Sequence, residues 1–289
     1  MTRQAFYQHF TRRERYREYE NWIVSLVRQL RKRLPQTGGN NLWRLVQRLL
    51  SILRLRPIGR DHLARLVKKN GLQVGRRKRR QIKTTYSGHR YAVQPNLLHD
   101  ITVDHPNQIL VADITYIRIA GSAAYLFLIT DAFSRAIVGY HLSNSLAHDG
   151  AVKALNMALE HIPDPKGVIH HSDRGVQYCC HNFLDEIRKW KFCSSMTDAD
   201  HCAQNALAEC MNGILKSEFL LDLDFVDLEQ AKRVVKDAIY AYNHLRIHGS
   251  LEGKTPIEVH YGCDDALEMW AKELIAYNLP DTPENLLYK

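Results

Sequence analysis

The sequence predicts an α/β protein in which a mixed five-stranded sheet with flanking helices follows a small all-α region. Apolar residues recur at helical spacing over residues 20–70, whereas runs rich in β-branched residues begin at Ile109. The charge changes as well: residues 1–95 carry 24 Lys and Arg against 4 Asp and Glu, and residues 96–289 carry 16 against 27. The resulting +20 and −11 indicate one part suited to a polyanion and another that gathers carboxylates.

Three helices are predicted in the basic part. They cover residues 20–34, 41–53 and 61–70, each with apolar residues three or four positions apart. Asp61 is predicted to be the N-cap of the third helix, and Gly71 the residue just past its C-terminal end. Short helices joined by turns with Gly and Pro, on a basic background, are typical of helix-turn-helix DNA-binding units.

A cationic run follows the third helix, and it consists of Arg76, Arg77, Lys78, Arg79 and Arg80. It is either a solvated linker or a set of phosphate contacts that release counterions from DNA. The charge of +20 favours DNA contact, and a linker that orders on DNA satisfies both interpretations. Residues 1–95 are therefore predicted to form a basic helical DNA-binding region that ends in a basic linker over residues 76–95.

The acidic part begins with three predicted strands. Residues 109–119 are apolar on both faces, which predicts a central strand, and turns separate them from strands at 125–130 and 136–140. A helix over 149–161, a strand over 167–171 and a further helix near residue 182 follow. Three strands, a helix, a strand and a helix are the order of an RNase H-like sheet.

Three acids stand out within this layout. Asp113 lies in the middle of an apolar strand, where a buried carboxylate needs a compensating partner such as a divalent cation. Asp173 directly follows the short strand, at the edge where open α/β sheets bind their ligands. Glu209 lies in a helical run over residues 203–219. The spacing, 59 residues and then 35, is the DD(35)E pattern of acids.

The triad is surrounded by further motifs. They are Asp113–Ile117, Asp131–Arg135, His171–Gly175, Gln177–Tyr178, Asn205–Glu209, Leu215–Glu218, Tyr242–His248 and Thr255–Glu258. With these motifs the chain resembles the second-reading-frame (OrfB-type) transposases of the insertion-sequence three family, which belong to the retroviral-integrase superfamily. The segment Gly39–Leu45 resembles part of that family's helix-turn-helix. The acid that commonly precedes Asn205 in the family is replaced here by Gln204.

The resemblance implies a DNA transposase that binds insertion-sequence ends and catalyses metal-dependent strand cleavage and strand transfer. An RNase H-like core over residues 96–262 would use Asp113, Asp173 and Glu209 to hold two Mg²⁺ ions, with Mn²⁺ as a substitute. Residues 263–289 would be a C-terminal tail. The implied partners are terminal inverted repeats, target DNA, a second copy or more of the chain on DNA, and the first-reading-frame protein of the element.

Further DNA contacts are expected from Arg174, Asn205, Lys216 and Arg246. Alternatives remain for three of them: Arg174 would orient Asp173, Lys216 would be solvated, and Arg246 would anchor the terminal helix together with Tyr242, Asn243 and His248. A hairpin turn is predicted to be shaped by Asp131, Ser134 and Arg135.

Other classes of protein are disfavoured. No apolar run approaches the roughly 18–20 residues that span a bilayer, and the N-terminus lacks the apolar stretch of a signal peptide, so we expect no membrane partner and a DNA-associated protein in the bacterial cytoplasm. The six cysteines include no CxxC pair, which argues against a zinc site. A catalytically silent DNA-binding regulator is disfavoured by the intact triad. A nuclease that hydrolyses without joining is disfavoured by the basic N-terminal part.

Overall fold

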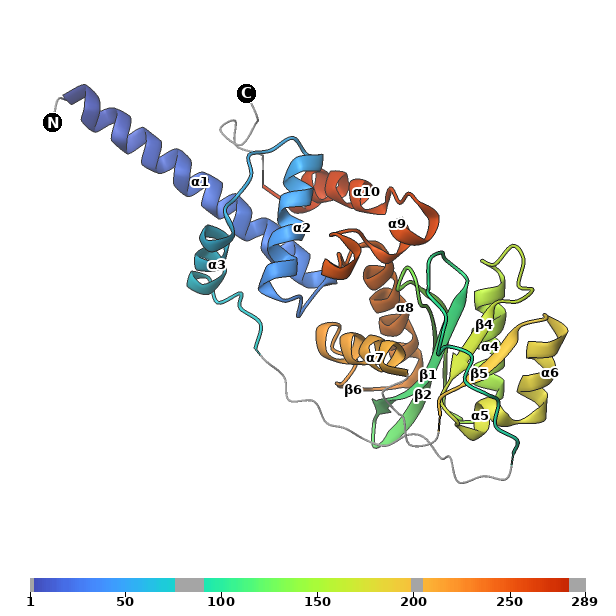
Figure 1. Cartoon of the computed structure of the whole chain (residues 1–289). Coiled ribbons are helices and arrows are strands. Elements are labelled where there is room, and N and C mark those ends of the chain that lie inside the picture. The colour runs from blue at the N-terminus through green and yellow to red at the C-terminus, as the bar shows by residue number, and fades with distance from the viewer. Residues whose placement is uncertain (1–2, 76–90, 199–204, 281–289) are drawn as a thin grey trace.

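A mixed sheet forms the centre of the computed structural model, which describes residues 3–75, 91–198 and 205–280 (Figure 1). Its strands are β1 (Ile109–Ile119), β2 (Ser122–Asp131), β3 (Ile137–Ser143), β4 (Ile169–Ser172), β5 (Cys193–Met196) and β6 (Asp224–Phe225). Five of them lie in the order β3-β2-β1-β4-β5, and β6 pairs with the far end of β1. The order confirms the predicted mixed sheet of RNase H-like topology, with β1 at its centre.

The strand directions explain how the sheet is mixed. The pairs β1–β2 and β2–β3 are antiparallel and joined by short turns, whereas β1–β4 and β4–β5 are parallel. The parallel pairs need crossovers, which helices supply. Strands β5 and β6 were not located from the sequence. Of the four residues of β5, only a cysteine and a methionine are apolar, and β6 has only two residues. Neither strand therefore produces a recognisable hydrophobic pattern.

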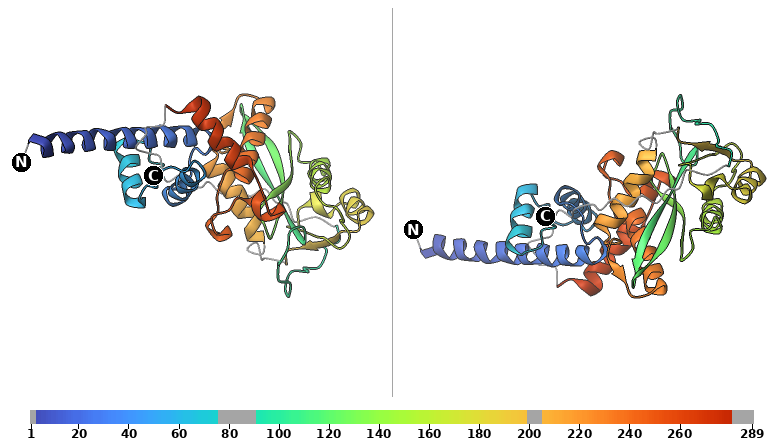
Figure 2. Two further views of the ribbon diagram at one scale, coloured as in Figure 1. Left: turned by 90° about the horizontal axis from the view of Figure 1, so that it is seen from above. Right: turned by 90° about the horizontal axis from the view of Figure 1, so that it is seen from below.

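Helices cover both faces of the sheet (Figure 2). One face is covered by α4 (Asp149–Leu159), α5 (Val176–Cys179) and α6 (His181–Lys189), and the other by α7 (Ala206–Glu218) and α8 (Leu228–His244). The residues of β1 alternate between two cores: Leu110, Ala112 and Ile114 pack with α4 to α6, whereas Ile109 and Val111 pack with Ala208 of α7. Because both faces of β1 are buried, its sequence is a nearly continuous apolar run.

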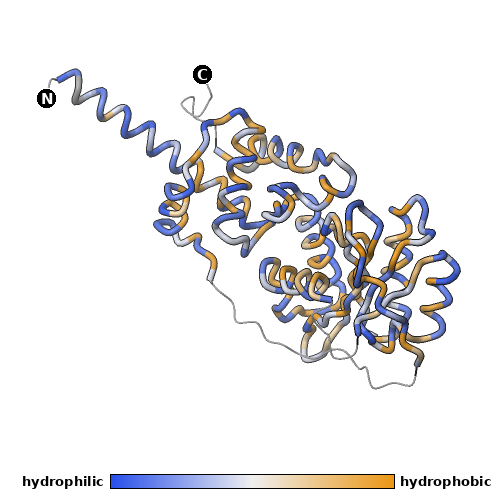
Figure 3. Tube along the Cα trace, viewed as in Figure 1, coloured by the Kyte–Doolittle hydropathy of each residue, from blue (hydrophilic) through white to orange (hydrophobic). Residues whose placement is uncertain are grey.

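Three helices precede the sheet, as predicted: α1 (Arg3–Arg33), α2 (Gly39–Ile52) and α3 (Arg60–Lys69). Helix α1 begins far before the predicted residue 20, and its described side chains from 3 to 18 are exposed. Figure 3 shows this projecting half as mainly hydrophilic, so it lacks the apolar periodicity on which the prediction depended.

The ends of α3 differ from the prediction at one position. The N-cap is Gly59, and Asp61 lies in the first turn, where its charge still favours the positive end of the helix dipole. At the other end Gly71 has a φ of 64°, a left-handed conformation that suits glycine just past a helix. The prediction for Gly71 is therefore confirmed, and the N-cap prediction was wrong by two residues.

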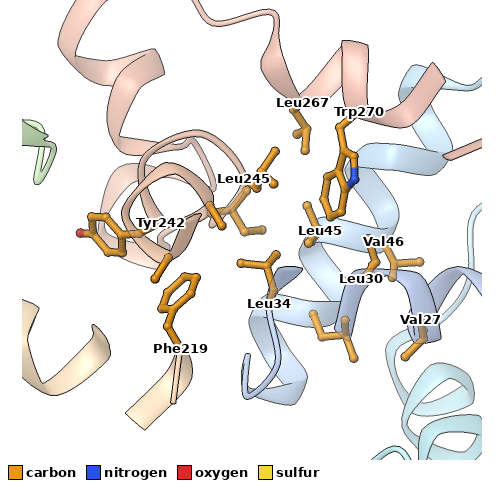
Figure 4. Close-up of a cluster of buried hydrophobic side chains, with 14 of the residues drawn as sticks. Val27, Leu30, Leu34, Leu45, Val46, Phe219, Tyr242, Leu245, Leu267 and Trp270 are labelled. Carbon is orange, nitrogen blue, oxygen red and sulfur yellow. The ribbon is translucent and has the colours of Figure 1, made fainter. Parts of the chain in front are cut away.

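The N-terminal helices share a core with the helices behind the sheet. Figure 4 shows Leu34, which directly follows α1, and Leu45 of α2 near Leu245, which directly follows α8, and Leu30 of α1 belongs to the same cluster. The backbone N–H of Gln36 donates to the carbonyl of Glu218 at 3.0 Å. The basic part is thus packed onto the α7–α8 layer.

The expected C-terminal tail is helical and packed over its described part. Helix α10 (Ala266–Glu273) and a π-helix (Leu274–Asn278) follow Cys263. Leu267 and Trp270 are buried in the same core as α1 and α2, and the indole N–H of Trp22 donates to the carbonyl of Pro280 at 3.3 Å. The expectation of a tail was wrong for residues 266–278, because the apolar face of α10 has a matching surface to bury.

Helix α9 (Pro256–Tyr261) provides a second link to the N-terminal part. Its first turn has a capping box in which Thr255 and Glu258 satisfy each other's backbone N–H groups. Glu258 also takes a bidentate pair of hydrogen bonds from Arg48 of α2, one of them 2.7 Å long.

None of the helices in the described ranges has the length and apolar character to cross a membrane.

Candidate active site

Asp113 and Asp173 lie at the same level of neighbouring parallel strands. The register of β1 and β4 pairs Ile109 with Ile169 and Val111 with His171. Asp113 is two residues beyond Val111, and Asp173 is two residues beyond His171. Strand β4 ends at Ser172, so Asp173 directly follows it. The two carboxylates therefore come together where the paired segment of β1 and β4 ends, as the sequence predicted for Asp173.

The side chain of Asp113 points to the face covered by α7. Its Oδ2 accepts a hydrogen bond from Nδ2 of Asn212 at 2.5 Å, and its Oδ1 accepts the backbone N–H of Ile114 at 2.9 Å. Burial is the largest cause that raises the pKa of Asp113, to about 7. The charge of Asp173 raises this pKa further, and that of Glu209 adds a smaller amount, against the two hydrogen bonds. Asp173 and Glu209 therefore lie near enough to Asp113 to act on it electrostatically.

Asp173 begins a tight turn before α5. Its Oδ1 accepts the backbone N–H of Gly175 at 3.0 Å. The neighbouring Arg174 donates from Nε to the carbonyl of Thr197 at 2.7 Å, beyond β5. The Arg174 guanidinium is thus held at the base of the turn that carries Asp173. This contact agrees with the orienting alternative for Arg174, and its phosphate contact stays a prediction.

Glu209 lies on α7 beside the helix stripe that packs on β1. The buried members of this stripe are Asn205, Ala208, Asn212 and Leu215, which recur at three- and four-residue spacing. Glu209 follows Ala208 and is exposed. Within the described ranges no group of three or more His, Cys, Asp or Glu side chains is close enough to hold one metal ion. The three acids thus share one neighbourhood without forming a closed ligand cluster.

Asn205 and Lys216 are placed differently from each other. Asn205 is 4% exposed and donates from Nδ2 to the carbonyl of Ala112 at 3.1 Å, so it pins the start of α7 to β1. The amide of Asn205 is thus engaged with the backbone of β1, and its DNA contact stays a prediction. Lys216 is half-buried, with Nζ 4.2 Å from the centre of the Tyr116 ring. Burial lowers the pKa of Lys216, and the charge of Asp113 opposes this shift, which puts its ammonium group near the acids.

Arg246 belongs to the interior. It is 6% exposed, and its Nε and Nη2 donate to the two carboxylate oxygens of Glu218 at 2.8 and 2.6 Å. Its Nη1 donates to Nε2 of His248 at 2.9 Å. Burial is the main cause that lowers the pKa of His248 to about 3, so this imidazole is neutral and able to accept. These contacts agree with the anchoring alternative for Arg246, and its DNA contact stays a prediction.

The other anchoring residues follow the same pattern. Asn243 bonds through its side chain to both the N–H and the carbonyl of Ile137, each at 2.9 Å, which fastens α8 to β3. The hydroxyl of Tyr242 donates to the carbonyl of Arg135 at 3.0 Å. In the predicted turn, Asp131 accepts from the N–H and hydroxyl of Ser134, and Arg135 adopts a φ of 66°. The turn prediction is confirmed.

Two groups of predicted residues need separate mention. The cationic run, Arg76 to Arg80, and Gln204 lie outside the described residues, so their DNA-binding and positioning roles stay predictions. Conversely, the sequence predictions gave Asn212 no role, although it lies in the helical run that carries Glu209. The seven-residue interval from Asn205 to Asn212 places both on one helix face, and that interval was the available signal that both meet β1.

The raised pKa of Asp113 makes the stability of the metal-free protein depend on pH. The pKa of Asp113 is about 7 in the folded state against 3.8 for an unperturbed Asp carboxyl, so the folded state binds the proton more tightly. This stabilisation is complete below the unfolded pKa and is lost as the pH rises through about 7. Between about pH 5 and pH 8 we expect the free energy of unfolding of the wild type to fall by on the order of 2 kcal/mol relative to that of Asp113→Asn. Urea unfolding with a chelator present measures this, and parallel pH profiles would contradict it.

Comparisons with known proteins agree with this geometry. The integrase core domain family matches residues 103–202, and a second integrase core domain family matches residues 192–256. The insertion element IS600 uncharacterized 31 kDa protein of Shigella sonnei is 37% identical over 201 residues, which are 69% of this chain and 74% of the relative. Transposase InsF for insertion sequence IS3A of Escherichia coli K12 is 32% identical over 202 residues, which are 69% of this chain and 70% of the relative.

Among solved structures, the HTLV-2 integrase catalytic core domain in complex with magnesium (trimeric form) is 20% identical, with a TM-score of 0.44. The similarity covers 54% of this chain and 98% of that one. The sheet order, the paired aspartates and the two family matches define an integrase-core protein, a class of polynucleotidyl transferases. More particularly, the chain belongs to the OrfB-type DNA transposases of the insertion-sequence three (IS3) family.

Proposed function

We propose that this transposase cleaves DNA at insertion-sequence ends and joins the freed ends to target DNA, with Asp113, Asp173 and Glu209 as its catalytic acids. The observation that carries the proposal is the placement of Asp113 and Asp173 at matching positions, each two residues beyond the last paired residues of the parallel strands β1 and β4. Glu209 is near enough to contribute to the raised pKa of Asp113.

The three acids fit divalent cations. Carboxylate oxygens are the ligands that Mg²⁺ and Mn²⁺ prefer. Burial and neighbouring negative charge disfavour the ionised form of Asp113, and a bound cation would compensate both effects. We expect the exposed side chain of Glu209 to turn toward the aspartates when metal binds. Two bound ions would neutralise the phosphate and stabilise the attacking and leaving oxygens.

The protein's own contribution is to hold these groups in place. Asp113 lies on a central strand, and its two oxygens are oriented by Asn212 and by the N–H of Ile114. Asp173 is oriented by the N–H of Gly175. We propose that Lys216, beside the acids, and Arg174, at the turn, contact DNA phosphates close to the reacting bond. Positioning of this kind supplies much of the rate in phosphoryl transfer.

The proposed reaction has two displacements. Water attacks the phosphodiester at the element end, the P–O3′ bond breaks, and the element strand leaves with a free 3′-OH. This 3′-OH then attacks a phosphodiester of the target, forming one new P–O bond while one target strand leaves with its own 3′-OH. Neither displacement forms a covalent bond between protein and DNA, so the chain's tyrosines and serines are not nucleophiles.

A strand-transfer assay tests the proposed function. A labelled duplex that carries the element's terminal repeat is incubated with the full chain, target DNA and Mg²⁺, Mn²⁺ or a chelator. We expect shorter labelled strands from cleavage and longer ones from joining, both only with metal. Shorter strands alone, under all metal conditions, would show a nuclease and would overturn the proposed transposition chemistry of this core.

We further propose that the basic N-terminal region binds the element ends. Neutralising Arg76, Arg77, Arg79 and Arg80 with Gln should weaken binding to end DNA and lower the slope of log affinity against log salt by about 3 to 4, because each lost phosphate contact removes about 0.9. Fluorescence anisotropy at several salt concentrations measures this slope. An unchanged slope would assign the segment to the linker interpretation.

The proposed complex contains more than one chain. Joining both ends of an element to one target brings two ends together, and we propose a dimer or larger assembly on DNA for this step. The first-reading-frame protein of the same element is the further proposed partner. Mass measurement of the chain with and without end DNA distinguishes a monomer from such an assembly.

A further inference from the structure

Helix α7 is fixed to the central strand by two asparagines that hold successive residues of β1. Asn205 donates to the backbone carbonyl of Ala112, and Asn212 donates to the carboxylate of Asp113. Both asparagines are buried, at 4% and 7% exposure. They lie seven residues apart and therefore on one helix face. The contact of Asn205 is with backbone, whereas that of Asn212 is with a proposed metal ligand.

The orientation of the Asn212 amide follows from chemistry. The amide nitrogen of Asn212 donates to Oδ2 of Asp113 at 2.5 Å, which is the orientation that suits the ionised, metal-binding form of this carboxylate, because that form can only accept hydrogen bonds. The amide oxygen then points elsewhere, and this buried atom has no hydrogen-bond partner in the described part of the chain. Leaving a buried acceptor unpaired costs on the order of 1–3 kcal/mol. A position selected for stability alone would favour an apolar residue here.

We propose that Asn212 is a positioning residue, which sets the orientation of the Asp113 carboxylate for metal binding and links that carboxylate to the helix that carries Glu209. The inference rests on the proposed function, since it needs Asp113 to be a metal ligand. With one oxygen of Asp113 held by a strand N–H and the other by α7, the carboxylate cannot rotate without breaking a hydrogen bond. Glu209 lies one turn before Asn212, so a shift of α7 moves both contacts together.

The test compares one substitution at two positions. Asn212→Ser removes the amide that reaches Asp113, and Asn205→Ser makes the same change at the backbone contact. Binding of Mn²⁺ to the full chain without DNA is measured by electron paramagnetic resonance. We expect Asn212→Ser to weaken Mn²⁺ binding about 10- to 100-fold, the range for loss of a group that orients a metal ligand, and Asn205→Ser to leave it within about twofold of the wild type.

A further variant at the same position keeps the result interpretable. Asn212→Gln retains the amide on a longer stem and should bind Mn²⁺ more tightly than Asn212→Ser, provided that circular dichroism shows both to be folded. If Asn212→Ser does not fold, the comparison of Asn212→Gln with Asn205→Ser takes its place, with weaker Mn²⁺ binding expected only for Asn212→Gln. Equal Mn²⁺ affinity for the wild type and the folded Asn212 variants would overturn the inference.

Asp113→Asn separates this inference from the proposed function. If that variant loses Mn²⁺ binding while the Asn212 variants retain it, the metal site stands and the positioning role of Asn212 falls. If Asp113→Asn binds Mn²⁺ as the wild type does, the proposed metal site itself falls, and the inference falls with it.

Discussion

Replacement of Asp173 by Asn is expected to abolish both DNA cleavage and joining while binding of the element ends stays nearly unchanged. The substitution keeps the size of the side chain, and an amide oxygen can still accept the N–H of Gly175. It removes one negative charge at the point where Asp113 and Asp173 meet, and with it the affinity of the site for cations. We expect at least about a 10³-fold loss of rate, equivalent to about 4 kcal/mol of barrier.

The control for this variant is Asp185→Asn. Asp185 lies on α6, and its carboxylate is exposed and pairs only with the exposed Arg188 three residues later. Asp185→Asn makes the same chemical change outside the proposed group of catalytic acids, so its rates of cleavage and joining should match those of the wild type. Labelled end DNA reports both reactions, and anisotropy reports binding. Joining at the wild-type rate by Asp173→Asn would remove this residue from the proposed chemistry.

Glu218→Ala is expected to cost about 3–5 kcal/mol of folding free energy, the largest stability effect that the structure predicts for an ion pair. Glu218 takes two hydrogen bonds from Arg246, whose side chain is 7% exposed. Without the carboxylate of Glu218 the guanidinium of Arg246 stays buried and loses its negatively charged partner. Its hydrogen-bond partner His248 is neutral and does not replace that charge. Urea unfolding of the full chain measures the loss.

The matched control is Glu229→Ala, which removes the exposed pair with Lys232 on α8. Exposed pairs of this kind contribute about 0–1 kcal/mol. A loss of under about 1 kcal/mol for Glu218→Ala would contradict the anchoring role of Arg246. A selective loss of end binding by folded Glu218→Ala, with its stability unchanged, would return Arg246 to the DNA-contact interpretation.

The importance of Glu218 extends beyond the pair with Arg246. Its backbone carbonyl accepts the N–H of Gln36, in the turn between α1 and α2, and it ends the helix that begins near Glu209. One short helix therefore connects the basic N-terminal part to the acidic site. The sharp change of charge along the sequence gives no sign of this connection, since the two parts meet through apolar side chains such as Leu34 and Leu245.

The hydrophobic pattern of the sequence was sufficient to predict the helices and strands in which apolar residues recur regularly. The bounds of β1 were predicted to the residue, because a run buried on both faces has few alternatives. The early start of α1 and the helical α10 were missed for a shared reason. The first half of α1 has no buried face in the described structure, and α10 acquires its buried face only by contact with α1 and α2.

For the site, the sequence by itself was enough to predict the three carboxylates, because their chemistry and their order along the chain can be read without the fold. Only the tertiary structure decided what surrounds them. Arg246 and Asn205 have the residue types of DNA contacts, yet burial commits them to Glu218 and to the backbone of Ala112. Asn212 meets Asp113 across 99 positions of chain. Desolvation and hydrogen bonding depend on such distant neighbours, which no local pattern specifies.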